Sequence, residues 1–251
     1  MERNLGVFFV LFCAFFLFSG QAHADTVEGL QVHNKTTLSG IILTGNTEKF
    51  TIGGREKLTI QKEAITDRLT AGITYSRDNI FNNLPVKTSD RDIFVKDKFL
   101  WNFVEKFYAY TGGGWLTHQT SGIDQQFDGL VGMGYKPPLP PKQTLSLEAG
   151  YDFEFRNRVS PFLNQTNHNA SFGFDYLWQI TDKTSLENET DNLFDVRHQK
   201  NIRVTSFTEL DVEIVKHLAL FFGFELKFEN DPVPTFKKLN TTSTVGITAN
   251  F

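Results

Sequence analysis

The stretch Leu239–Phe251, LNTTSTVGITANF, decides which fold the sequence predicts. Its odd-numbered positions bring Leu239, Val245 and Ile247 to one side, while the even-numbered positions are almost all polar. A period of two with one apolar side is typical of a half-buried β-strand. A strand at the end of a sheet leaves unpaired backbone groups, and pairing with the first strand of a closed barrel removes that edge. We therefore expect a barrel, with the last strand of a soluble β-sandwich as the alternative.

The final residue, Phe251, carries an aromatic ring, and aromatic rings gather at the interfaces of membrane barrels. This ending resembles the C-terminal strand of bacterial outer-membrane barrels, whose final Phe is read by the barrel-assembly machinery. The resemblance predicts that Phe251 is the assembly signal.

The first residues have the pattern of a secretory signal peptide. Arg3 precedes an apolar run from Leu5 to Phe18, which is short for a membrane-spanning helix. Ala22-His23-Ala24 then provides a small-residue cleavage site. We expect residues 1–24 to be a cleaved signal peptide and residues 25–251 to form an outer-membrane β-barrel domain.

Composition narrows the class of protein further. The net charge of −4 gives no reason to expect a nucleic acid as partner, and the one cysteine, Cys13, lies within the predicted signal peptide. The exported chain would therefore have no disulfide to stabilise it. Beyond the signal peptide the sequence has no apolar stretch long enough for a membrane helix and no long helical periodicity. The fold class that we predict is all-β: a closed antiparallel up-and-down transmembrane β-barrel.

About twelve segments have the character of strands, and their lengths suit membrane strands of about 9–11 embedded residues. We expect them roughly at 36–45, 49–61, 67–78, 90–101, 106–117, 124–136, 143–156, 166–179, 183–194, 201–213, 217–229 and 239–251. Short connections alternate with longer ones between these segments, as the periplasmic turns and outer loops of outer-membrane barrels do. The dipeptide Gly45-Asn46 predicts a tight first hairpin. The proline-rich stretch 136–142 is better explained as a stiff turn than as a linker or a polyproline ligand.

Charged side chains fall on the side of the strands opposite the apolar and aromatic ones. A Lys or Arg facing lipid at mid-bilayer costs about 2–4 kcal/mol, so we expect these groups to line the lumen. The predicted lumen-lining residues are Glu148, Asp152, Glu154, Asp175, Glu187, Glu189, Asp191, Arg203, Glu209, Asp211, Glu213, Glu225 and Lys227, with Lys96, Lys98 and Arg156 as further basic counterparts. Rings of acidic side chains favour cations in a pore. Twelve strands lie between the widths of filled and open barrels, so a packed interior and a narrow pore are both open.

An enzyme would need a nucleophile beside a histidine on the outer wall near the lipid headgroups. His118 lies near Thr117, Thr120 and Ser121 and is the one candidate for such a lipid-modifying hydrolase. The sequence has no G-x-S-x-G elbow, H-E-x-x-H motif or glycine-rich phosphate loop, so no catalytic residue, cofactor or metal is predicted. The run Gly112-Gly113-Gly114 falls within a predicted strand, where it is expected to relieve crowding or curve the barrel.

The sequence resembles the salt-induced outer-membrane protein family (YdiY-like), a family of unknown function. The pieces that carry the resemblance are Leu43–Thr47, Gly122–Asp124, Gly132–Tyr135, Leu147–Gly150, Tyr176–Lys183 and Asn230–Pro234. The family often has an acidic residue near Asn240, where this chain departs from it. The resemblance implies an outer-membrane barrel but brings no substrate or site residues.

From these patterns we expect a narrow porin-like channel or an envelope-integrity barrel, tied to salt or osmotic stress through the resemblance. The expected partners are outer-membrane lipid, the barrel-assembly machinery and small cations or other small solutes.

Overall fold

The computed structural model describes residues 29–43, 48–79, 87–118, 122–159, 161–197, 201–233 and 237–251. The strands are β1 Leu30–Leu43, β2 Glu48–Lys62, β3 Ile65–Asn79, β4 Lys87–Val104, β5 Phe107–His118, β6 Ile123–Tyr135, β7 Gln143–Arg158, β8 Gln165–Thr181, β9 Thr184–Asp195, β10 Ile202–Val215, β11 Leu218–Glu229 and β12 Leu239–Asn250. No helix in this described part of the chain is long and apolar enough to cross a membrane. The predicted signal peptide, residues 1–24, lies outside the described residues.

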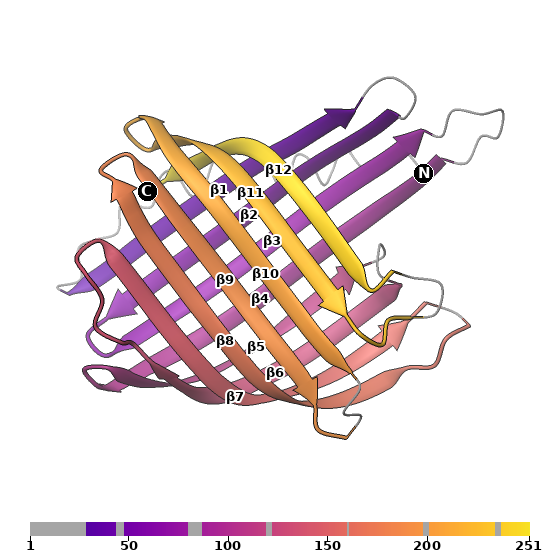
Figure 1. Cartoon of the computed structure of the whole chain (residues 1–251), viewed down its shortest axis with the longest axis horizontal. Helices are drawn as coiled ribbons and strands as arrows, with labels where there is room; N and C mark the ends of the chain where they lie inside the picture. The colour runs from indigo at the N-terminus through magenta and orange to yellow at the C-terminus, as the bar shows by residue number, and fades with distance from the viewer. Residues whose placement is uncertain are drawn as a thin grey trace. The chain divides into compact units, whose positions relative to one another are not determined.

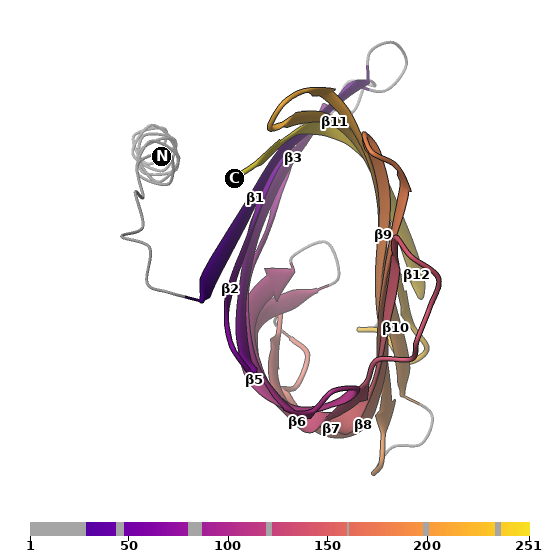
Figure 2. The same cartoon turned by 90° about the vertical axis from the view of Figure 1, so that its left-hand side faces the viewer.

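The twelve strands form one closed barrel in which each strand lies beside its neighbours in sequence (Figure 1). The ring closes where β12 pairs antiparallel with β1, from Lys35 opposite Asn250 to Gly40 opposite Val245. Viewed from the end, β1 to β3 lie across the ring from β9 and β10 (Figure 2). The predicted closed up-and-down barrel is confirmed, and the alternative of a sandwich is wrong.

The seam between the first and last strands extends to the final residue. The backbone N–H of Asn34 donates to the carbonyl of Phe251, and the N–H of Phe251 donates back to the carbonyl of Asn34, both at 2.9 Å. The ring of Phe251 stacks on that of His217, with centroids 5.8 Å apart. β1 begins at Leu30 rather than near residue 36, and the sequence missed its start because 31–35 are mostly polar on both faces.

Burial in the barrel is the reverse of that in a soluble protein. Phe153 and Phe155 of β7 are 44% and 40% exposed, while the intervening Glu154 is fully buried. Successive side chains of a strand point to opposite faces, so the aromatic rings lie on the outside and the carboxylate points into the lumen. An outer surface of this kind suits lipid rather than water.

Connections of different lengths gather at the two ends of the barrel. The turn end carries the connections 63–64, 105–106, 136–142, 182–183 and 216–217, and the described residues of the loop-end connections are 122, 159, 161–164, 196–197, 201, 230–233 and 237–238. The proline-rich stretch is the β6–β7 turn, as predicted, while the predicted first hairpin turn at 45–46 lies outside the described residues. Lys142 donates to Asp182 at 2.8 Å between two of the turns, and this hydrogen bond and the ammonium charge lower the pKa of the Asp182 carboxyl.

Glycines make room for bulky groups inside the wall. A Cβ placed on Gly134 of β6 would lie 2.0 Å from the ring of Tyr108, which covers this position. A Cβ on Gly112 of β5 would lie 2.5 Å from the backbone oxygen of Asp97. The prediction that Gly112–Gly114 relieves crowding within a strand is confirmed at Gly112.

Candidate functional site

In the described part of the barrel, the lumen has a cavity toward each end. The loop-end vestibule has a volume of about 350 Å³, and its lining includes Asp92, His118 and Lys237. The turn-end vestibule has a volume of about 380 Å³, and its lining includes His33 and Phe251. Both are mainly lined by side chains that point inward from the strands.

A layer of ion pairs lies between the two vestibules. Lys57 of β2, Arg68 of β3 and Asp175 of β8 line both cavities, which places them at the boundary. Arg68 Nη1 donates to Asp175 Oδ2 at 2.9 Å, and Lys57 contacts both Glu187 and Glu189 of β9. These pairs join strands on opposite sides of the barrel, so the side chains meet across the lumen. We call Arg55, Lys57, Arg68, Asp175, Glu187 and Glu189 the ion-pair layer.

The two walls that meet in this layer carry opposite charge. Its cations come from β2 and β3, and its anions come from β8 and β9. Further pairs extend the same division: Lys35 of β1 contacts Glu209 and Asp211 of β10, with 2.7 Å to Asp211 Oδ2. Lys98 of β4 contacts Glu148 of β7. At the level of these pairs the lumen is therefore polarised from one wall to the other rather than uniformly acidic.

Aromatic rings of β4 and β10 contact a cation of the layer. The guanidinium of Arg55 lies 4.4 Å from the ring centroid of Phe207 and 5.9 Å from that of Phe94. Cation–π contacts of this kind favour the charged head at a fixed place. Arg55 Nη2 also donates to Glu189 Oε2 at 2.9 Å. Planar guanidinium groups suit such combined stacking and ion pairing better than an ammonium does.

A second network covers the wall of the loop-end vestibule. Glu154, which is fully buried, accepts from Arg203 Nη1 at 2.5 Å and from Asn167 Nδ2 at 2.7 Å. Arg156 lies 3.3 Å from the same carboxylate and donates to Glu229 at 2.7 Å. Two guanidinium groups therefore share one carboxylate, which balances a buried charge that would otherwise be costly.

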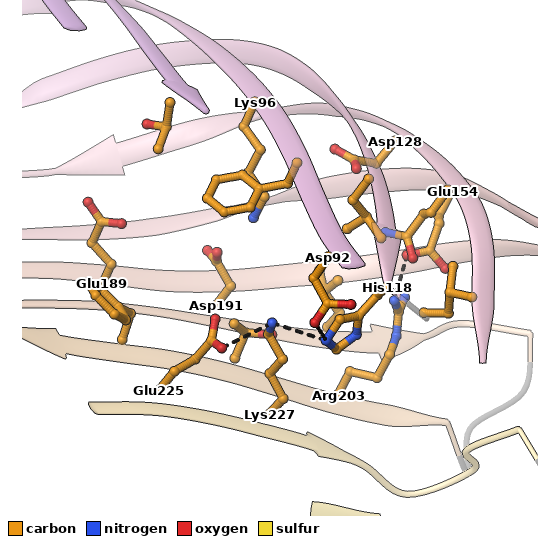
Figure 3. A pocket seen from close by; sticks show the side chains of 18 of the residues that line it. Asp92, Lys96, His118, Asp128, Glu154, Glu189, Asp191, Arg203, Glu225 and Lys227 are labelled. Atoms are coloured by element: carbon orange, nitrogen blue, oxygen red, sulfur yellow. Dashed lines mark hydrogen bonds and ion pairs between the residues drawn. The ribbon is translucent and has the colours of Figure 1, made fainter. Parts of the chain in front are cut away.

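A chain of polar contacts runs from β4 to β11 near the mouth of this vestibule (Figure 3). His118 Nε2 lies 3.1 Å from Asp92 Oδ2 and 3.4 Å from Lys227 Nζ, and Lys227 lies 3.1 Å from Glu225. His118 thus points into the lumen rather than toward the outer wall that a lipid substrate would meet. This placement gives no support to the hydrolase alternative, whose hydroxyl candidates Thr120 and Ser121 lie outside the described residues.

The predicted lumen-lining residues are distributed over these features. Asp152, Glu154, Asp175, Glu189, Asp191, Arg203, Glu225 and Lys227 line the loop-end vestibule, and Asp175 and Glu187 line the turn-end vestibule. Glu148, Glu209 and Asp211 form cross-lumen pairs. Glu213 lies near the turn end of β10. Of the further basic residues, Lys96, Lys98 and Arg156 line the loop-end vestibule.

Sequence reasoning missed the cations of the first strands, namely Lys35, Arg55, Lys57 and Arg68. The signal was present in β2, where Arg55 and Lys57 alternate with Gly54, Glu56 and Leu58. Glu56 lies on the outer face of β2, where its carboxylate accepts a hydrogen bond from Thr36 Oγ1 at 2.5 Å. Because this outer residue is also charged, the alternation of charged and apolar residues along β2 was not evident. Within the described ranges, no group of three or more His, Cys, Asp or Glu side chains is placed to hold a metal ion.

Comparisons with known proteins give a family and a fold. A family profile described as "Protein of unknown function, DUF481" matches residues 36–251. No curated protein matches the chain.

The NanC porin superposes with a TM-score of 0.52 at 9% identity, covering 86% of this chain and 98% of that one. An outer membrane channel from Pseudomonas putida F1 gives 0.49 at 11% identity, covering 92% and 98%. The translocator domain of the autotransporter NalP from Neisseria meningitidis gives 0.46 at 12% identity, covering 99% and 98%. At so low an identity, the likeness to NanC shows an outer-membrane barrel fold.

Proposed function

We propose that this chain, which belongs to the family described as "Protein of unknown function, DUF481", is a narrow channel of the bacterial outer membrane. The observation that carries the proposal is a single ion-pair layer with a cavity on each side of it. A barrel whose interior served only to fill space would be packed along its whole length. A lumen with a cavity toward each end and a layer of ion pairs between the two cavities has the form of a channel with one constriction.

The constriction would select by charge and size. Basic groups of β2 and β3 face acidic groups of β8 and β9, so a solute in the gap meets an electric field directed across the pore. The pairs are partly exposed: the side chains of Arg55 and Glu189 retain 24% and 28% of their accessible surface. Water at such pairs screens them, so the layer would slow small ions and solutes rather than exclude them.

Conductance across a planar bilayer tests this proposal. The purified chain, refolded and inserted at low density, should give discrete current steps with a preference for cations over anions. Its heat-modifiable mobility in gel electrophoresis would establish that the inserted material is folded. A folded barrel that inserts and carries no current contradicts the channel and favours an envelope-integrity role.

The proposal also covers how the chain reaches the outer membrane and what it does in the cell. The chain would lose residues 1–24 on export, be inserted with the help of the assembly machinery through Phe251, and reside among outer-membrane lipids. The mass of the protein recovered from outer membranes would test cleavage after Ala24. The resemblance to a salt-induced family leads us to place the channel in the response to salt or osmotic stress. Normal growth of a deletion strain at high salt would contradict that role.

A further inference from the structure

We infer that the outer wall at β9 and β10 is the interface through which two copies of this chain associate within the membrane. The inference goes beyond the channel and depends only on a bilayer around the barrel, so it holds whether or not the lumen conducts. The two strands pair from Ile202 opposite Phe194 to Val212 opposite Thr184. They lie on one long side of the ring (Figure 2).

A patch of polar side chains faces outward at this wall. In β9 the side chains of Glu187, Glu189 and Asp191 line the cavities of the lumen, so the residues between them point to the outside. In β10 Thr205 and Phe207 line the loop-end vestibule, and their neighbours likewise point outward. We call the five outward residues the polar patch: Asn188, Thr190 and Asn192 of β9, and Ser206 and Thr208 of β10.

The polar patch lies in the middle of the wall rather than at the membrane surface. Asn188 and Asn192 are four and eight residues from Thr184, the first residue of β9, which ends at Asp195. Apolar side chains continue the outer face of β10 toward the turn end, with Leu210 and Val212. Hydrocarbon cannot replace the hydrogen bonds that water makes, so polar side chains in this position favour contact with protein over contact with lipid.

Hydrogen bonds hold most of the polar patch in one arrangement. Asn188 Nδ2 donates to Thr208 Oγ1 at 2.7 Å and to Ser206 Oγ at 3.2 Å. Thr190 Oγ1 donates to Asn188 Oδ1 at 2.9 Å and lies 2.8 Å from Ser206 Oγ. A partner therefore meets a preorganised surface, which loses little side-chain freedom on association.

Asn192 is the member of the patch with unused hydrogen-bonding capacity. Its Nδ2 donates to the backbone oxygen of Phe172 at 3.1 Å, which is its one side-chain hydrogen bond among the described residues. A primary amide has two N–H donors and a carbonyl acceptor, so one N–H and Oδ1 remain available. Two such amides related by a two-fold axis can exchange two hydrogen bonds, because each presents a donor and an acceptor. This self-complementarity points to a second copy of the chain as the partner.

The flanking strands give the surface a shape that fits another barrel. Phe172 and Phe174 of β8 lie beside the polar patch on one side, and Phe224 of β11 lies beside it on the other. These rings are 52%, 37% and 45% exposed, whereas Thr190 is 8% exposed. Two convex walls approach most closely along one line. Short side chains on that line let the backbones come close, and the rings beside it fill the gap that widens on each side.

The surface is large enough for a dimer. Strands lie about 4.8 Å apart and the apolar band of an outer-membrane barrel is about 25 Å tall, so the strip from β8 to β11 presents about 500 Å². Two copies would bury about 1,000 Å², which reaches the lower limit for a specific interface. Both copies are inserted in the same direction, so their two-fold axis is parallel to the membrane normal.

Disulfide crosslinking in lipid vesicles tests the interface. The chain has one cysteine, Cys13, so Cys13→Ser gives a background without thiols. Asn192→Cys in this background should form a covalent dimer on mild oxidation, with a yield at least 10-fold above that of Val131→Cys. Val131 is the matched control, because it is 56% exposed on the outer wall of β6, and β7 and β8 separate that strand from β9. Equal yields at the two positions would show random collision and overturn the inference.

Sedimentation equilibrium of the refolded chain in density-matched detergent measures the dissociation constant of the dimer. Asn192→Leu removes the amide, and Ser206→Phe places a ring within the polar patch. Each should weaken the dimer at least 10-fold, while Val131→Leu should leave it unchanged. Heat-modifiable mobility in gel electrophoresis establishes that each variant is folded. A folded parent chain that stays monomeric would overturn the inference, and unchanged dissociation constants in both variants would overturn the assignment to this wall.

Conductance separates this inference from the proposed channel. A dimer that carries no current contradicts the channel and leaves the interface intact. A monomer that conducts contradicts the interface and leaves the channel intact. Crosslinking of Asn192→Cys to a different protein in native outer membranes, without the homodimer, would overturn the second copy as the partner.

Discussion

Arg55 of β2 and Glu189 of β9 meet across the lumen, with Nη2 of the guanidinium 2.9 Å from Oε2 of the carboxylate. The two strands are not neighbours in the barrel, so this contact joins opposite walls. Lys57 contacts the same carboxylate. Within the ion-pair layer, these two cations and the carboxylates of Glu187 and Glu189 therefore balance one another.

Removing the cations of this group should make the lumen more selective for cations. The double variant Arg55→Gln and Lys57→Gln removes both cations that contact Glu189 and one of the two that contact Glu187, the other being Lys35. One unit charge at 4 Å contributes about 1 kcal/mol in water, which corresponds to about a fivefold change in the ratio of cation to anion permeability. Reversal potentials in a salt gradient measure the ratio. An unchanged ratio in channels that still conduct would show that ions do not pass this layer.

Removing anions should shift selectivity the other way. The double variant Glu189→Gln and Asp191→Asn takes away one paired and one unpaired carboxylate from β9 and leaves Arg55 without its ion-pair partner. Permeability should move toward anions by about the same factor. The same gradient experiment applies, and Glu213→Gln near the turn end serves as a control. A shift in the same direction for both double variants would contradict a lumen polarised between its walls.

Charges on the outer wall should destabilise the barrel according to their depth. Val131 is 56% exposed near the middle of β6, and Gln125 is exposed near the loop end of the same strand. Val131→Arg should cost about 2–4 kcal/mol and Gln125→Arg about 0–1 kcal/mol in lipid. Reversible urea unfolding from lipid vesicles measures both values. Equal costs would contradict a bilayer around this wall.

Filling the space under Tyr108 should cost stability. A Cβ at Gly134 would lie 2.0 Å from the ring, which is itself 1% exposed and held by a 2.8 Å hydrogen bond to Glu148. Gly134→Ala should therefore lower the free energy of unfolding by about 1–3 kcal/mol. Gly129→Ala on the same strand has free space and should change it by less than about 0.5 kcal/mol. Similar values for the two variants would show that Tyr108 moves aside without cost.

The last residue should affect assembly more than stability. Phe251→Ser keeps the backbone hydrogen bonds to Asn34 and removes the ring that stacks on His217. Recovery of the protein in outer membranes should fall several-fold, while refolding into detergent proceeds as for the parent chain. Equal losses in both measurements would assign Phe251 a structural role in place of the predicted recognition by the assembly machinery.

The sequence predicted the barrel because apolar and charged side chains alternate along the strands with a period of two. The alternation is clearest in β7, where Phe153 is 44% exposed and Glu154 is fully buried. Strand ends were less predictable, since the start of β1 is polar on both faces. The ion-pair layer could not be predicted. Alternation predicted that Glu189 points inward, but which cation it meets depends on the width of the ring.

The separation of faces in β7 also limits how such a chain can change in length. One extra residue after Gly150 would turn Asp152, Glu154 and Arg156 toward lipid and the neighbouring rings toward water. Two extra residues would restore both faces. The sheet has register shifts at Asn102/Val104 and Glu213/Val215, close to strand ends, where a single additional residue already bulges out. In homologous sequences, insertions and deletions inside strands should therefore involve even numbers of residues. Insertions and deletions of odd numbers of residues should be confined to bulges and loops.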